Sequence, residues 1–267
     1  MQGNNHIDIQ HPEAWNLLIS VAEGRLDYIL YAPSVPGSLV VGEVDWPDGT
    51  LQGLEDAVYA APVLLGDYKS VRLLVDSRHY VLFPSTVSDD DCDALLRMAF
   101  PGDDGDTVVS ALPLCGLKLA MILPPGMRSF LGRTFNYPQV SHRLAPLCEY
   151  VKGQAGAQGL MFIHLLDGSM DLVAFRDGML QSASSFACTG DQDAAYHALA
   201  AWRASGMDQL GDELQFIGSG EMCSATVARL REFVKQVRPA RYPAAALQLG
   251  RNAMQAPLDL ILLALCE

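Results

Sequence analysis

Acidic residues outnumber basic ones by 31 to 18, which gives this 267-residue chain a net charge of −13. Such a chain repels phosphodiester backbones unless its basic residues gather on one face, and its arginines and lysines are scattered. The composition therefore disfavours nucleic acid and anionic membrane as partners. The length exceeds the usual single-domain size of roughly 100–150 residues, so we expect two domains.

The N-terminal stretch MQGNNHIDIQHPEAW has neither a basic start nor an apolar core, which predicts no signal peptide and a cytoplasmic location. The apolar run ILLALC at 261–266 is far shorter than the ~20 residues that span a bilayer. The cysteines are widely separated, without the paired spacing of zinc sites, which predicts buried thiols. They are Cys92, Cys115, Cys148, Cys188, Cys223 and Cys266.

The first elements along the chain are two apolar runs that meet at Glu23-Gly24, where glycine permits a tight hairpin turn. A third strand follows, then a segment with helical spacing of apolar residues, which we expect to end or kink near Pro62. The predicted order is strand, strand, strand, helix, strand, over 17–23, 26–33, 38–44, 51–61 and 70–84.

The same order recurs in the second half. Its hairpin turns at Asp167-Gly168, and a constant offset of 144 pairs Gly24 with Gly168 and Asp27 with Asp171. Thr189 is expected to cap the helix of this half, which stops at Gly206. The pattern favours internal duplication, with domains at 1–155 and 156–267 and a linker at 153–159. The strands and helix are expected at 159–168, 170–178, 179–187, 191–206 and 214–221.

Further elements complete each half. Ser88 precedes the acidic run Asp89-Asp90-Asp91 in the manner of a helix cap, where negative charge is favourable. A strand, a helix opened by Pro125, a short strand and another helix follow this capped helix, and a further helix follows the second closing strand and ends before Pro239. Their expected ranges are 88–100, 116–124, 125–135, 137–142, 144–153 and 224–237.

A hairpin, third strand, helix and fourth strand, present twice, resemble the ribonuclease-H-like fold as duplicated in the actin, Hsp70 and sugar-kinase superfamily. Across about 80–220 the chain more closely resembles an uncharacterised bacterial family, a domain of unknown function with an actin-like ATPase fold. The phrases that carry this resemblance are YVLFPSTVSDDD, LPLCGLKLAMILPPGMRSFLGRTF, VSHRLAPLCEYV and LLDGSMDLVAFRDGML. The expected fold class is α/β, with two actin-like domains whose mixed sheets are flanked by helices.

This resemblance implies an aspartate at the end of the first strand of each domain, two residues before a glycine, to hold the metal and water. Registered on the hairpin glycines, those positions hold Ala22 and Leu166. A frame aligned on the second-strand aspartates gives Ser20 and His164 instead. Without these carboxylates, phosphoryl transfer loses its main means of neutralising developing charge. We assign no catalytic residue and no metal site, and interpret the ATPase as degenerate.

Candidate ligand-binding residues remain at three turns, and each has a purely structural alternative. The hairpin tips contribute Glu23, Gly24, Asp167 and Gly168, although acidic residues and glycine are also common turn formers. Gly218-Ser219-Gly220 follows the second closing strand, where backbone amides and the next helix could approach a phosphate. A glycine turn needed only for its geometry is the simpler interpretation, and Glu221 disfavours an anion at this helix.

Three classes of function stay open. The first is a non-catalytic binding or scaffolding protein, a pseudo-ATPase that needs no cofactor and binds a protein partner or its own copy. The second is a nucleotide-binding protein or kinase-like ATPase that uses ATP and Mg²⁺ through relocated acidic ligands. A ribonuclease-H-type nuclease is the third, and it lacks both clustered carboxylates and a basic track for its substrate.

Overall fold

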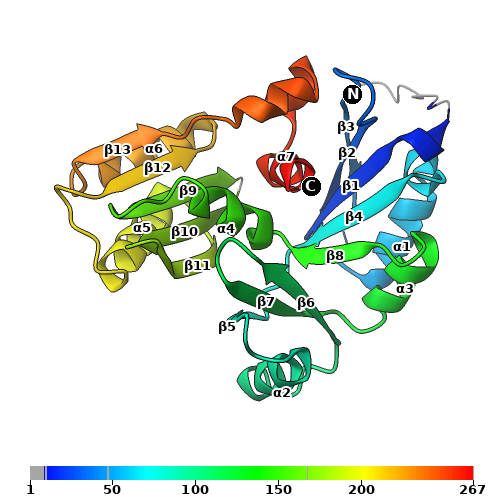
Figure 1. Ribbon diagram of the computed structural model, residues 1–267, viewed down its shortest axis with the longest axis horizontal. Coiled ribbons are helices and arrows are strands. Elements are labelled where there is room, and N and C mark those ends of the chain that lie inside the picture. The colour runs from blue at the N-terminus through cyan, green and yellow to red at the C-terminus, as the bar shows by residue number, and fades with distance from the viewer. Residues whose placement is uncertain (1–8, 10, 47, 167, 267) are drawn as a thin grey trace. The chain divides into compact units, whose positions relative to one another are not determined.

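The computed structural model describes residue 9 and residues 11–46, 48–166 and 168–266. Its contacts divide the chain into two units (Figure 1). The first unit comprises Met1–Ser110, Leu119–Arg143 and Pro243–Glu267, and the second comprises Ala111–Lys118 and Leu144–Tyr242. Each unit contains a five-stranded mixed sheet of its own.

The sheet of the first unit has the strand order β3-β2-β1-β4-β8. β1 pairs antiparallel with β2 and parallel with β4, and β4 pairs parallel with β8. The strands are β1 (Asn16–Ala22), β2 (Arg25–Tyr31), β3 (Val40–Asp45), β4 (Ser70–Val75) and β8 (Gln139–His142).

Helices cover both faces of this sheet (Figure 1). Two of them, α1 (Leu51–Tyr59) and α3 (Met127–Thr134), lie on one face, and α7 (Leu258–Leu265) lies on the other. Thr50 caps α1 by accepting a hydrogen bond from the Gly53 amide. After α1 the chain forms a 3₁₀ turn, η2 (Pro62–Leu65), so the predicted end of this helix near Pro62 is confirmed.

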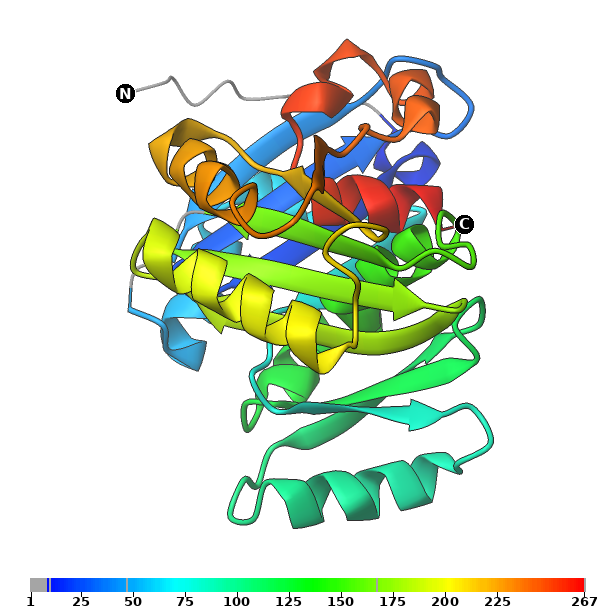
Figure 2. The ribbon, with the colours of Figure 1, turned by 90° about the vertical axis from the view of Figure 1, so that its left-hand side faces the viewer.

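The second unit repeats this topology, with the strand order β11-β10-β9-β12-β13. Its core lies between one sheet face and α5 and α6, which Figure 2 shows in front of the strands. The opposite face packs against α4 (Leu144–Lys152), whose Tyr150 ring meets Phe162 edge-on. The remaining elements are β9 (Leu160–Leu166), β10 (Ser169–Arg176), β11 (Met179–Ala187), α5 (Asp191–Ala204), β12 (Glu213–Ile217), α6 (Gly220–Leu230) and β13 (Gln236–Pro239).

The two hairpins keep the predicted offset of 144 residues. β9 and β10 begin at residues 160 and 169, which are 144 positions after the starts of β1 and β2 at 16 and 25. The cross-strand register is also the same, since Ser20 lies opposite Asp27 and His164 lies opposite Asp171. The predicted order of hairpin, third strand, helix and fourth strand is therefore confirmed in both halves.

A third, three-stranded sheet with the order β5-β7-β6 corrects one expectation. Residues 70–84 were expected to form one strand, yet they form β4 and β5, which belong to different sheets. The Ser77 hydroxyl breaks the run, because it donates to the Ile122 carbonyl and accepts from the His79 amide. The inserted elements are β5 (Tyr80–Pro84), α2 (Asp89–Ala99), β6 (Asp106–Leu112) and β7 (Leu117–Leu123).

Three smaller expectations are wrong. The helix expected over 224–237 begins at Gly220 and ends at Leu230, and the chain then enters β13. Gly190, not Thr189, stands at the N-cap of α5, and the Thr189 amide donates instead to the Asp193 carboxylate. The cysteines are only partly as predicted, since Cys115 is half-buried and Cys266 is exposed while the other four are buried.

Two features make the units differ from the predicted division at residue 155: α4 already belongs to the second unit, and the C-terminal segment belongs to the first. Residues 243–267 return to the first unit, where the amides of Gly37 and Leu39 donate to the carbonyls of Gln248 and Leu249. The expected linker at 153–159 lies inside the second unit. Among the described residues, no helix is long and apolar enough to cross a bilayer.

Candidate functional site

The hairpin of the first unit ends in Glu23 and Gly24. Gly24 has a φ of 85°, the left-handed conformation that the tight turn requires. The Glu23 carboxylate lies 3.3 Å from Arg78, and both side chains are about four-fifths exposed, at 82% and 80%. An exposed pair of this kind contributes roughly 0–1 kcal/mol, so Glu23 is a solvated turn residue with a weak partner.

The corresponding turn of the second unit contains Asp167, which lies outside the described residues, and Gly168. Gly168 also has a positive φ, 73°, and its carbonyl accepts a hydrogen bond from the Cys188 amide. This bond ties the turn to the end of β11.

Gly218-Ser219-Gly220 lies at the same end of the second sheet as this hairpin turn, because Ile217 pairs with His164 in the parallel β9–β12 ladder. At Gly218, with a φ of 155°, an added Cβ would lie 2.8 Å from the Leu165 carbonyl oxygen. Gly220 begins α6 with a φ of 86° and has open space around its Cα. Gly218 is thus required by close contact with β9, whereas a Cβ added at Gly220 would meet no neighbouring atom within 4 Å.

The strand-end positions that hold metal-binding aspartates in the resembled fold carry Ala22 and Leu166, both half-buried. Neither side chain can coordinate a cation. No group of three or more histidine, cysteine, aspartate or glutamate side chains suited to a metal ion occurs among the described residues.

Two carboxylates do lie on the α7 face of the first sheet, at positions that the hairpin pattern does not indicate. The Ser20 hydroxyl donates to Asp259 of α7 over 2.6 Å, and the side chain of Asp27 lies opposite Ser20. Burial raises the pKa of Asp27, the Arg25 guanidinium 2.6 Å away opposes this effect, and the negative charges of Asp259 and Glu43 add to it.

The matching position of the second unit holds Asp171, which is only 3% exposed. Its carboxylate accepts a hydrogen bond from the Ser185 hydroxyl over 2.6 Å, from the neighbouring strand β11. Cys148 of α4 is buried close to this site, and burial, with smaller contributions from Cys115, Glu149 and Asp171, raises its thiol pKa. A thiol held neutral in this way is a poor nucleophile and a poor metal ligand.

Sequence reasoning missed Asp259, because 239 residues separate it from Ser20 and it follows Pro257 in a run of leucines that reads as core. It did register Asp27 and Asp171, but only as members of the repeat. The sequence did not show how far these two side chains are shielded from solvent. Strands covered on both faces lose the alternation of apolar and polar residues that identifies a buried face.

Comparison with solved structures identifies the architecture. The chain is similar to a Bacteroides thetaiotaomicron protein with an actin-like ATPase fold and unknown function, at 21% identity and a TM-score of 0.76, covering 94% of this chain and 98% of the other. It is also similar to the PilM–PilN type IV pilus biogenesis complex, at 12% identity and a TM-score of 0.51, with coverage of 94% and 98%. Both likenesses concern the fold alone, which is therefore the actin-like ATPase fold.

Comparison with functionally curated proteins finds no match. A family model matches residues 4–237, which is most of the chain and includes both hairpins. The chain therefore belongs to the family described as protein of unknown function (DUF3822).

Proposed function

We propose that this protein is a non-catalytic binding or scaffolding protein, a pseudo-ATPase that uses the actin-like fold to bind a protein partner. The observation that carries the proposal is the replacement of both strand-end aspartates by Ala22 and Leu166. Phosphoryl transfer depends on positioned positive charge, which in this fold comes through a metal held by carboxylates. Apolar side chains at both positions remove that means of holding the metal.

Four carboxylates in and beside the hairpins, all among the described residues, support the same proposal, because each of the four already has a partner within its own unit. Arg25 binds Asp27, Arg78 binds Glu23, and Ser20 donates to Asp259. Ser185 donates to Asp171 in the second unit. A metal ion would have to displace these partners, at a cost of about 1–3 kcal/mol for a buried hydrogen bond such as that of Asp171 and roughly 0–1 kcal/mol for the exposed Arg78–Glu23 pair.

A protein of the same fold is known in complex with another protein, since one of the similar structures is the PilM–PilN complex. This precedent is consistent with a partner-binding role and says nothing of the partner here.

Phosphate release in the presence of ATP and Mg²⁺ tests the proposal. We expect the wild-type protein to release phosphate no faster than buffer. Turnover that is lost in Asp27→Asn, in Asp259→Asn or in Asp167→Asn, and retained in Glu232→Gln, would overturn the proposal. Glu232 is an exposed carboxylate in the second unit and controls for the loss of one negative charge.

One observation favours a second candidate, a nucleotide-binding protein with relocated acidic ligands. Asp259 of α7 accepts a hydrogen bond from Ser20, and its negative charge contributes to the raised pKa of Asp27. Two carboxylates therefore share one face of the first sheet. If these residues hold Mg²⁺, then Mg²⁺ alone should raise the melting temperature of the wild type and leave that of Asp259→Asn unchanged.

A further inference from the structure

Helix α2 carries apolar residues on two faces. The small core beneath the helix accounts for those on the inner face but not for those on the outer face. On the inner face, Cys92 and Leu96 are fully buried against Phe83, Ala120 and Ile122. On the outer face, Leu95 and Met98 are 45% and 78% exposed. Single exposed apolar residues are common, so these two indicate a binding surface only if they lie together on one face of the helix.

The exposed residues form one stripe. Asp91, Ala94, Leu95 and Met98 stand at positions i, i+3, i+4 and i+7 of the helix, and all four are exposed. Residues at this spacing lie side by side along one face of an α-helix. We call these four residues the α2 outer face.

Negative charge lies at both ends of this face. Seven aspartates and one arginine, Arg97, occur between residues 89 and 106. Arg97 is held within the insertion, where it pairs with Asp93 over 3.0 Å and donates to the Gly105 carbonyl over 3.4 Å. Asp90 in the first turn and Asp104 after the last turn are exposed and flank α2, whose 11 residues extend about 16 Å along the helix axis.

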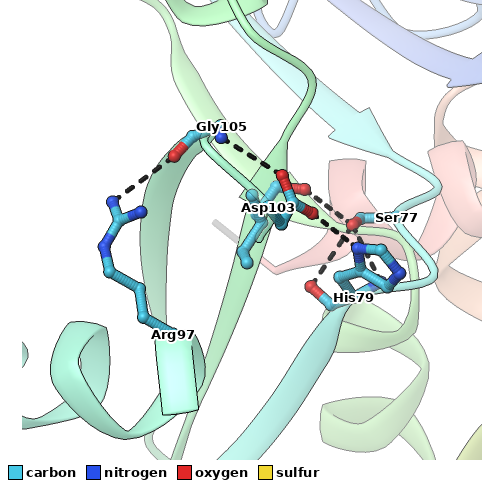
Figure 3. A network of polar contacts seen from close by, with 6 residues as sticks. Ser77, His79, Arg97, Asp103 and Gly105 are labelled. Atoms are coloured by element: carbon cyan, nitrogen blue, oxygen red, sulfur yellow. Dashed lines mark hydrogen bonds and ion pairs between the residues drawn. The ribbon is translucent and has the colours of Figure 1, made fainter. Parts of the chain in front are cut away.

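Polar contacts hold the helix and the loop that follows it (Figure 3). Asp103 accepts a hydrogen bond from the Gly105 amide over 3.1 Å and lies 2.5 Å from Nδ1 of His79. The His79 ring stacks on Phe100 with 4.5 Å between ring centroids. At the other end, Ser88 caps α2 by accepting from the Asp91 amide. The outer face is therefore fixed in place before any partner arrives, which lowers the entropy lost on binding.

The charge pattern selects the occupant. A second copy of this face would bring like charges together at both ends, and anionic lipid would be repelled in the same way. We propose that the α2 outer face binds a segment of another protein that has apolar residues at its centre and lysine or arginine at both ends. This inference deepens the proposed binding function by naming the chemistry of the partner.

A synthetic helical peptide of about 14 residues, long enough to span α2, tests the proposal. It has leucines on one face and lysines at both ends, and a companion peptide has glutamine in place of every lysine. Each is titrated into the isotope-labelled full chain and followed by NMR. We expect shifts centred on residues 90–98 and about tenfold tighter binding of the lysine peptide.

Two variants separate the contributions. Asp90→Asn/Asp104→Asn should abolish the preference for the lysine peptide, and Leu95→Ser/Met98→Ser should weaken both peptides about tenfold or more. The matched control is Leu210→Ser/Glu232→Gln, which changes a 69% exposed leucine and an exposed carboxylate in the second unit and should bind like the wild type. Unchanged melting temperatures show that the variants are folded.

Shifts elsewhere on the protein, or equal losses in the control variant, would overturn the proposal. A wild-type dimer in sedimentation that Met98→Ser dissociates would also overturn it, because the occupant would then be a second copy. The result is independent of ATP turnover. Peptide binding together with phosphate release would refute only the non-catalytic function, whereas absence of both would refute only the docking surface.

Discussion

The β1–β2 and β9–β10 hairpins share one register, yet the half-buried Asp27 and the buried Asp171 at matching positions have different partners. Asp27 lies opposite Ser20, pairs with Arg25 and shares its face with Asp259 from α7. Asp171 lies opposite His164 and accepts a hydrogen bond from Ser185 of β11. The first arrangement depends on the C-terminal segment returning to the first unit, and the second is built from adjacent strands.

This difference shows that a repeated backbone does not fix a repeated electrostatic environment. Main-chain register depends on the apolar pattern and the turn, which both hairpins keep. The surroundings of a buried carboxylate depend on whichever side chains the flanking helix and strand supply. The same fold can therefore retain its shape while its metal-holding residues are lost, and each prediction below compares residues whose surroundings differ.

The largest contrast concerns the two thiols outside the buried set. Burial raises the pKa of Cys115 to about 12, with the Glu149 carboxylate adding to the effect, whereas Cys266 is exposed. Because the thiolate is the reactive form, Cys115 at neutral pH should react with maleimide about a thousandfold more slowly than a thiol of ordinary pKa. Mass spectrometry of the labelled native protein should find Cys266 modified first. Rapid labelling of Cys115 would contradict this environment.

The next contrast separates two glycines of one turn. Gly218→Ala should lower the free energy of unfolding by about 3 kcal/mol, because positive φ strain adds to a Cβ only 2.8 Å from the Leu165 oxygen. Gly220→Ala should lower it by about 1 kcal/mol, since its φ of 86° is strained but the space is open. Urea denaturation measures both. Equal losses would mean that Gly218 is not required by its contact with β9.

A third prediction concerns the aspartate of the second unit. Asp171→Ala should destabilise the protein by about 2 kcal/mol, because it removes the carboxylate that accepts from the Ser185 hydroxyl in a buried setting. The double variant Asp171→Ala/Ser185→Ala should recover part of this loss, since no hydroxyl is then left without that acceptor. Thermal unfolding of both variants checks the coupling, and strictly additive effects would contradict it.

The smallest effect is expected at Asp27. Its raised pKa means that the folded state holds the proton more tightly than the unfolded state does. The stability gained from the protonated carboxyl is therefore fully present below the unfolded pKa near 3.9 and is lost as pH rises through the folded pKa. At neutral pH the charge of the half-buried Asp27 is therefore unfavourable, and Asp27→Asn should stabilise the protein by about 0.5 kcal/mol despite the lost Arg25 pair. The gain should vanish near pH 3. A loss of stability at pH 7 would show that the Arg25 pair dominates.

Much of the fold could be predicted from the sequence because its hairpins are long, apolar and bounded by glycine turns. The helix stop at Gly206 and the cap at Ser88 were also readable, since both are local signals. The break at Ser77 was not, because it depends on a hydrogen bond to Ile122, which is 45 residues away in sequence. Neither the return of α7 nor the position of Asp259 leaves a local pattern.

The candidate site shows the same division. The absence of carboxylates at Ala22 and Leu166 is visible in the sequence, because it depends only on spacing from the turn glycines. The role of Gly218 needed the structure, since a glycine in a turn and a glycine against a neighbouring strand read alike. The exposed stripe on α2 could not be predicted, because the helix has apolar residues at both buried and exposed positions and the sequence does not distinguish them.

Calorimetric titration of the full chain with ATP in the presence of Mg²⁺ tests the central claim most directly. If Ala22 and Leu166 have removed the metal-holding positions and Glu23, Asp27, Asp171 and Asp259 are engaged within their own units, the titration should show no saturable heat. Saturable binding that requires Mg²⁺ and is abolished by Asp259→Asn, but not by Glu232→Gln, would contradict the claim and identify relocated ligands.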